Sequence, residues 1–177
     1  GVGFKIAFMV TSVAQGWAMS VHSALGVLPF EIFTIGTLSL LFTLMLTAVV
    51  CVLMGCGVPT TANYIVMIAV AAPVLGMMNV EPIVAHFFVF YFGVLADVTP
   101  PVALAAYAAA GIAGANGFQA GNTAFRLSMG KAMVPFVFVF SPSLLIVTEA
   151  FTIQDFLLAF LGATLGILSL SAAITNW

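Results

Sequence analysis

Long apolar runs separated by short polar breaks make up most of the sequence. The runs cover residues 6–25, 38–56, 62–78, 83–96, 102–115, 132–148 and 156–174. Runs of about 17 to 20 residues match a bilayer core roughly 30 Å thick, because an α-helix rises 1.5 Å per residue. The pattern therefore predicts an all-α, polytopic membrane protein.

The composition supports lipid as the surrounding solvent. Hydrophobic residues make up 64% of the chain and charged residues 5%, and the mean hydropathy is +1.30. A soluble domain carries about a quarter charged residues, mostly on its water-facing surface. The net charge of −2 also provides no basic patch, so we expect no nucleic-acid partner.

The breaks divide one membrane domain into four segments. Residues 1–36 are predicted to form a first span and an outer loop, and 37–79 a helical hairpin with its tip at 57–61. Residues 80–131 are predicted to form a broken transmembrane helix and a cytoplasmic loop, and 132–177 two final spans. Because the sequence opens on Gly1 and not on methionine, we expect a piece of a longer polypeptide.

The few charged residues predict the orientation, since cytoplasmic loops retain Lys and Arg. With the basic residues inside, the acidic breaks fall outside. This places Lys5, Arg126 and Lys131 in the cytoplasm and Glu31, Glu81, Glu149 and Asp155 on the opposite side.

The first polar break with candidate binding residues runs from Asp97 to Pro101 and has the sequence Asp-Val-Thr-Pro-Pro. Both prolines lack an N–H, so upstream carbonyls lose their helical partners. Thr99 before Pro100 is the pattern of an N-cap that restarts a helix. Unwound backbone at membrane depth is tolerated where it is buried in protein or lines a water-filled cavity, and its carbonyls can coordinate a cation such as sodium.

Two questions about this break stay open on the sequence alone. The break can be a simple proline kink whose carbonyls are satisfied by Thr99 or by a neighbouring helix. The Asp97 side chain can act as an ionised cation partner, as a protonated carboxyl in a proton path, or as a cap for backbone N–H groups.

The second break runs from Gly57 to Thr61 and is followed by Asn63. It contains glycine, proline, hydroxyl and amide groups but no charge. This composition favours a re-entrant hairpin whose tip lies inside the protein. A tight turn between two complete crossings remains the alternative.

The other reactive residue types form no pattern of an enzyme. Cys51 and Cys56 lie in one apolar run without metal-ligand spacing, and His22 and His86 are assigned to hydrogen bonds between helices. An intramembrane aspartyl protease needs two carboxylates, and only Asp97 lies amid apolar sequence. We expect neither enzyme activity nor a bound cofactor.

The two breaks resemble motifs of a known family. Residues 55–67 and 86–113 are similar to the hairpin and broken-helix motifs of TRAP transporter permeases, the tripartite ATP-independent periplasmic transporters. Resemblance covers most of residues 1–143, and the chain looks like the C-terminal half of the large membrane domain of the fused type. Residues after 151 match no motif of that family.

The resemblance implies half of an inverted-repeat, elevator-type transporter in the cell inner membrane, completed by the N-terminal part of the permease. The implied ion- and substrate-binding residues are Gly57, Pro59, Thr60, Thr61 and Asn63 at the hairpin tip and Asp97, Thr99, Pro100 and Pro101 in the unwound helix. Sodium is the implied coupling ion, bound at Thr99, Asp97 and Gly57.

The implied function is sodium-coupled uptake of an organic acid or similar small solute, which an extracytoplasmic solute-binding protein delivers. Proton coupling in the same architecture is one alternative. A purely structural or assembly subunit is another, although such a subunit does not need two uncharged polar breaks at membrane depth.

Overall fold

Helices form all the regular structure of the residues described by the computed structural model, which are 2–25, 34–147 and 151–175. The α-helices are α1 (Val2–Leu25), α2 (Ile35–Gly55), α3 (Thr60–Met77), α4 (Pro82–Leu95), α5 (Leu104–Ala113), α6 (Gly117–Ser128), α7 (Val134–Phe140) and α8 (Ile153–Thr175). Three short 3-10 helices are η1 (Ala96–Val98), η2 (Lys131–Met133) and η3 (Pro142–Leu145). The all-α prediction is confirmed. The predicted outer positions Glu31 and Glu149 lie outside the described residues.

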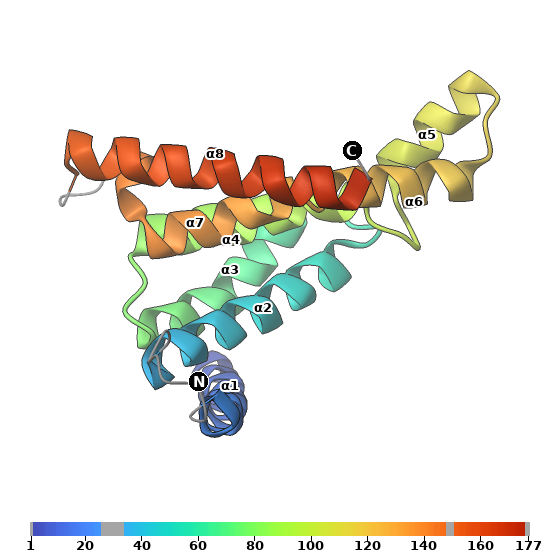
Figure 1. The fold of residues 1–177 in the computed structure, drawn as a ribbon. Helices are drawn as coiled ribbons and strands as arrows, with labels where there is room; N and C mark the ends of the chain where they lie inside the picture. Colours follow the sequence, from blue (N-terminus) through green and yellow to red (C-terminus); the bar gives the residue numbers. More distant parts are fainter. Residues whose placement is uncertain (1, 26–33, 148–150, 176–177) are drawn as a thin grey trace.

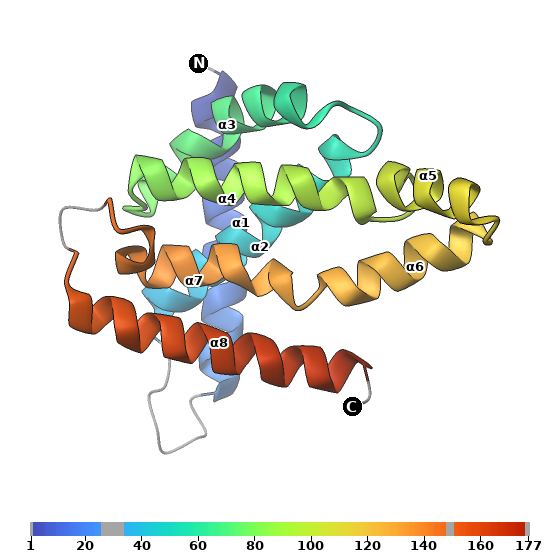
Figure 2. The same cartoon turned by 90° about the horizontal axis from the view of Figure 1, so that it is seen from above.

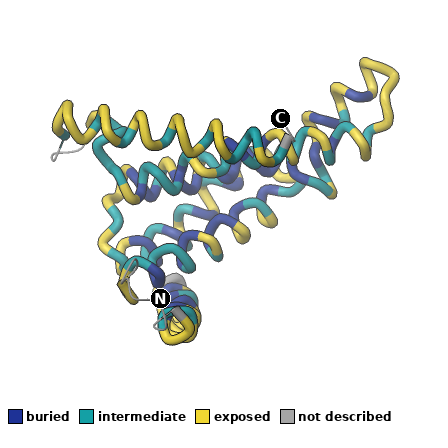
Figure 3. The backbone as a smooth tube through the Cα atoms, in the orientation of Figure 1, coloured by how far each residue is buried: buried dark blue, intermediate teal, exposed yellow. Residues whose placement is uncertain are grey.

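Helix α4 is the centre of the core, and α2, α3 and α7 pack around it. Its inward residues Val84, Phe88 and Val89 are fully or almost fully buried, and Figure 3 shows the dark buried positions along this part of the chain. The ring of Phe136 on α7 packs edge-on against Phe88 and Phe92, at centroid distances of 5.5 and 5.8 Å. These aromatic contacts fix α7 along α4.

Helices α2 and α3 form the predicted hairpin, joined by a turn at 56–59 and packed against each other and α4. Helix α1 crosses this hairpin instead of running along it (Figures 1 and 2). The face of α1 toward the hairpin consists of small residues at helical spacing, the buried Ala7, Thr11, Ala14 and Ala18. Small side chains allow the two layers to approach closely.

Three described helices are long and apolar enough to cross a membrane: α2, α3 and residues 153–174 of α8. Helix α1 is not among them, because its serines, Gln15 and His22 lower its hydropathy, and its predicted crossing stays a prediction. The segments 117–128 and 131–140 meet the same standard together, as one span bent by 49°. The structure thus has a second broken helix that the sequence did not predict.

The three rows α4–α5, α6–α7 and α8 run side by side (Figure 2). Residues 132–148, predicted as one kinked span, are helical in α7 only to Phe140. The helix ends there because Pro142 has no N–H to donate, and Ser141 adopts φ −140°, ψ 73°.

Candidate functional site

The break in α4 leaves one carbonyl without a possible helical donor. Helix α4 ends at Leu95, η1 covers 96–98, and α5 starts at Leu104. The residues three and four positions after Asp97 are Pro100 and Pro101, which have no N–H. The Asp97 carbonyl therefore lacks a helical donor, whereas the Ala96 carbonyl accepts a hydrogen bond from the Thr99 N–H at 3.1 Å.

Thr99 closes α4 and does not start α5. Its hydroxyl donates to the Leu95 carbonyl at 2.8 Å, and its N–H donates to the Ala96 carbonyl at 3.1 Å. The prediction that Thr99 caps the N-terminus of the restarted helix is wrong. The residue before α5 is Ala103, which has a left-handed φ of 36°. Ala103 therefore separates the prolines from the new helix.

The hairpin tip is a short turn that depends on glycine. Gly57 has φ +80°, a conformation that L side chains rarely adopt. Pro59 precedes the first turn of α3 and provides no side-chain cap for its N–H groups. Thr60 and Thr61, predicted in the tip, lie in that first turn of α3. The tip therefore presents an uncapped helix N-terminus, which favours an anion.

The hairpin tip and the break in α4 lie against each other. A Cβ on Gly55 would lie 2.6 Å from the Cβ of Ala96, so the backbone at the end of α2 lies in close contact with η1. A Cβ on Gly57 would lie 3.9 Å from Val102, within the break. The structure thus brings together the two motifs that the sequence singles out 40 residues apart.

Asn63 sits in the notch between the hairpin and α4. It is 2% exposed, and its Nδ2 donates to the Cys51 carbonyl at 3.2 Å, joining α3 to α2. The same nitrogen would lie 2.5 Å from a Cβ on Gly55 and 3.3 Å from one on Gly93. Its Oδ1 is buried and has no hydrogen-bond partner. A buried amide oxygen of this kind calls for a donor or a cation, because leaving it unpaired is unfavourable.

Asp97 also lines a cavity on another side of the break. Asp97 is half-buried and lines this cavity of about 430 Å³ together with Lys131, at the junction between α6 and α7. Phe90, Tyr91 and Val94 form much of the remaining wall, and no described hairpin residue takes part. Asp97 thus shares a cavity with a basic residue of the second broken helix.

Two residues near the break, Tyr107 and Lys131, lie outside the predicted set. The Tyr107 hydroxyl donates to the Pro101 carbonyl at 2.9 Å. Its ring lies against α6, where a Cβ on Gly121 would come within 2.7 Å of the ring. The signal available in the sequence was one aromatic residue in a helix of alanines, facing glycines spaced four apart at Gly117 and Gly121. No local sequence pattern marked Lys131 as a residue near the site.

One family model matches the chain, and its description is "Tripartite ATP-independent periplasmic transporter, DctM component". The match covers residues 1–153, which include the hairpin, both broken helices and the region up to the start of α8. Neither the curated proteins nor the solved structures gave a match.

Proposed function

The chain belongs to the DctM component family of the tripartite ATP-independent periplasmic transporters, and we propose that its hairpin tip and helix break form half of a sodium-coupled solute site. Membership makes it a membrane component of a transporter and not an enzyme. Sodium coupling, the solute and the transport movement belong to the proposal.

The contact between the two unwound segments is the observation that carries the proposal. Discontinuous helices in transporters use unwound carbonyls for the coupling ion and helix N-termini for anionic substrate groups. Here the break supplies the free carbonyl of Asp97 and the hydroxyl oxygen of Thr99, and the tip supplies the backbone around Gly57. The buried, unpartnered Oδ1 of Asn63 is a further oxygen in the same region.

The proposed cation site keeps Thr99, Asp97 and Gly57, with a changed role for Asp97. Because the backbone carbonyl of Asp97 has no helical donor at Pro100 or Pro101, we assign this carbonyl to the ion. Oxygen ligands suit a hard cation. The uncapped N-terminus of α3, at Pro59, Thr60 and Thr61, is assigned to the carboxylate of an organic acid.

Membership of the family supports a proposal for the membrane arrangement. We propose that α2–α3 is re-entrant, that the hairpin moves with α4–α5 as an elevator, and that the N-terminal part of the permease completes the site. The protein would lie in the inner membrane and receive its solute from an extracytoplasmic binding protein.

Proton coupling is the second candidate function, and the position of Asp97 supports it. A half-buried carboxyl that shares a cavity with Lys131 is the kind of group that carries protons in membrane transporters. Uptake driven by an imposed proton gradient, with no sodium present, would establish this alternative.

The test is uptake by the complete permease and its binding protein in proteoliposomes, with an imposed sodium gradient and, separately, an imposed proton gradient. Thr99→Ala should raise the sodium concentration for half-maximal uptake about tenfold, because a lost ligand contact to a charge is worth about 1.5 kcal/mol.

Thr164→Ala is the matched control. Thr164 on α8 also donates to a carbonyl four residues earlier, Phe160, at 2.7 Å, but lies far along the chain from the site. The sodium dependence of uptake by Thr164→Ala should equal that of the wild type. Unchanged sodium affinity in Thr99→Ala would refute the assigned site.

A further inference from the structure

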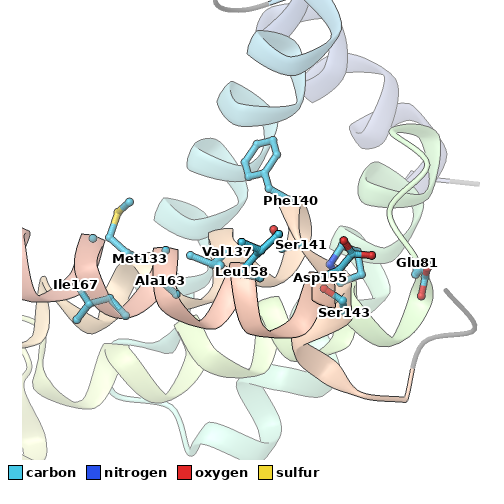
Figure 4. Close-up of a pocket in the computed structure, with 14 residues that line it drawn as sticks. Glu81, Met133, Val137, Phe140, Ser141, Ser143, Asp155, Leu158, Ala163 and Ile167 are labelled. Atoms are coloured by element: carbon cyan, nitrogen blue, oxygen red, sulfur yellow. The ribbon is translucent and has the colours of Figure 1, made fainter. Parts of the chain in front are cut away.

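Helix α8 stands away from α7 and leaves a groove between them. The groove has a volume of about 770 Å³ and is lined by residues of α7, η3 and α8, with Glu81 from the start of α4 (Figure 4). None of the window of α8 that could cross a membrane is buried. The groove lies at the edge of the part of the chain that the family model matches, because that match ends where α8 begins.

The groove side of α8 carries four small residues, and its two glycines lie in open space. Gly162 and Gly166 line the groove with Ala159 and Ala163, and a Cβ on either glycine would meet no atom within 4 Å. In membrane helices, glycines spaced four apart normally allow close helix contact. Here this face of α8 is open.

Both ends of α8 are nevertheless held in place. At the N-terminal end α8 contacts η3, and at the C-terminal end it contacts α6. There Arg126 donates to the Ile174 carbonyl at 3.1 Å, and Gly130 lies close to the Ser171 side chain. The groove therefore lies between two regions in which α8 contacts the rest of the described chain.

The two ends of the groove differ in charge. Figure 4 shows Glu81, Asp155 and Ser143 toward one end and Met133 and Ile167 toward the other. Among the described residues, the lining contains no Lys, Arg or His. Asp155 accepts a hydrogen bond from Thr152 at 2.6 Å, so its carboxylate is held at the start of α8.

The length of α8 sets the acidic end at the membrane interface. Asp155 and the Ile174 carbonyl bound by Arg126 are separated by roughly 28 Å at 1.5 Å rise per residue, close to the thickness of the hydrocarbon core. The orientation rule places the basic residues in the cytoplasm. The acidic end of the groove therefore lies on the opposite side of the membrane.

We propose that this groove binds a phospholipid whose headgroup carries a protonated amine, as in phosphatidylethanolamine. An acyl chain lies along Val137, Leu158 and Ile167, and the ammonium group lies between Glu81 and Asp155. The hydroxyls of Ser141 and Ser143 are placed to donate to the phosphate.

The charge pattern of the groove favours a lipid with an amine headgroup, because carboxylates lie at one end and apolar side chains line most of the rest. A flexible acyl chain needs only a narrow slot, and the smooth face of Gly162 and Gly166 provides one. This proposal requires a membrane protein but not sodium coupling, so the two proposals fail independently.

The test is native mass spectrometry of the purified chain in mild detergent, with equimolar palmitoyl-oleoyl phosphatidylethanolamine and phosphatidylglycerol. We expect about a fivefold preference for the ethanolamine lipid, the size that two solvent-exposed ion pairs provide. In Glu81→Gln/Asp155→Asn this preference should fall below about twofold. The asparagine still accepts the bond from Thr152, which protects the start of α8.

A second pair of variants tests the groove itself. Ala163→Phe fills it and should lower the retained amount of both lipids, whereas Leu161→Phe on the outer, exposed side of α8 should not. Equal retention of the two lipids by the wild type would overturn the proposal. So would a preference that survives in Glu81→Gln/Asp155→Asn, or a co-purified transmembrane segment in place of lipid.

Discussion

Gly55→Ala should separate the hairpin from the broken helix, although alanine is the better helix former. The added Cβ would lie 2.5 Å from Asn63 Nδ2 and 2.6 Å from the Cβ of Ala96. Asn63 is held by its bond to the Cys51 carbonyl, and a Cβ cannot rotate away. The end of α2 must therefore move by about 1 Å to reach an ordinary contact of ~3.5 Å.

The magnitude follows from two opposing terms. Overpacking of a tight site costs about 1 to 3 kcal/mol, and Gly→Ala inside a helix stabilises by about 0.5 to 1 kcal/mol. With the middle of each range, the net loss is about 1.3 kcal/mol. For a chain of this length that corresponds to a melting temperature roughly 3 to 5 °C lower.

Thermal unfolding in detergent, followed by tryptophan fluorescence, measures this effect. Trp17 packs edge-on against Phe42 at 6.0 Å and reports on α2. Gly76→Ala is the control, because a Cβ there meets nothing within 4 Å and should leave the melting temperature equal or higher. Gly93→Ala, at 3.3 Å from Asn63, should fall between them. Equal melting of the Gly55 and Gly76 variants would refute the packing of tip against break.

Two further substitutions test the tip and the break. Gly57→Ala should lower stability by about 1 to 2 kcal/mol through its left-handed φ of +80°, read as a lower melting temperature; Gly111→Ala, in open space on α5, is its control. Tyr107→Phe removes the hydroxyl that donates to the Pro101 carbonyl and should cost about 0.5 to 1.5 kcal/mol. Hydrogen exchange at Leu104 to Tyr107 should then be faster, and unchanged exchange would show that this bond does not hold the break.

The positions of both interruptions were predictable because their causes are local. Two prolines remove two N–H donors wherever they occur, so the end of α4 near Asp97 follows from the sequence. Gly57 and Pro59 likewise end α2 and start α3. The cap was less predictable: Thr99 has the right neighbour for an N-cap, but its hydroxyl reaches back to Leu95. A threonine can satisfy either side of a break, and only the surrounding backbone selects one.

The bend between α6 and α7 escaped prediction for a related reason. The polar residues from Asn116 to Lys131 lower the hydropathy of this stretch, so it reads as a loop with an interfacial helix. In the structure, α6 packs along α5, and Tyr107 fits against Gly121. Packing against a neighbouring helix outweighs local hydropathy here.

The sequence by itself determined the helical class, the membrane setting and the two breaks, because bilayer thickness and missing N–H donors act along the chain. Only the tertiary structure decided which faces meet. It placed Asp97 and Lys131 around one cavity, placed Asn63 in a notch of glycines, and gathered Glu81 and Asp155 at one end of a groove. These contacts depend on the rotation and offset of each helix, which side-chain packing between distant segments sets.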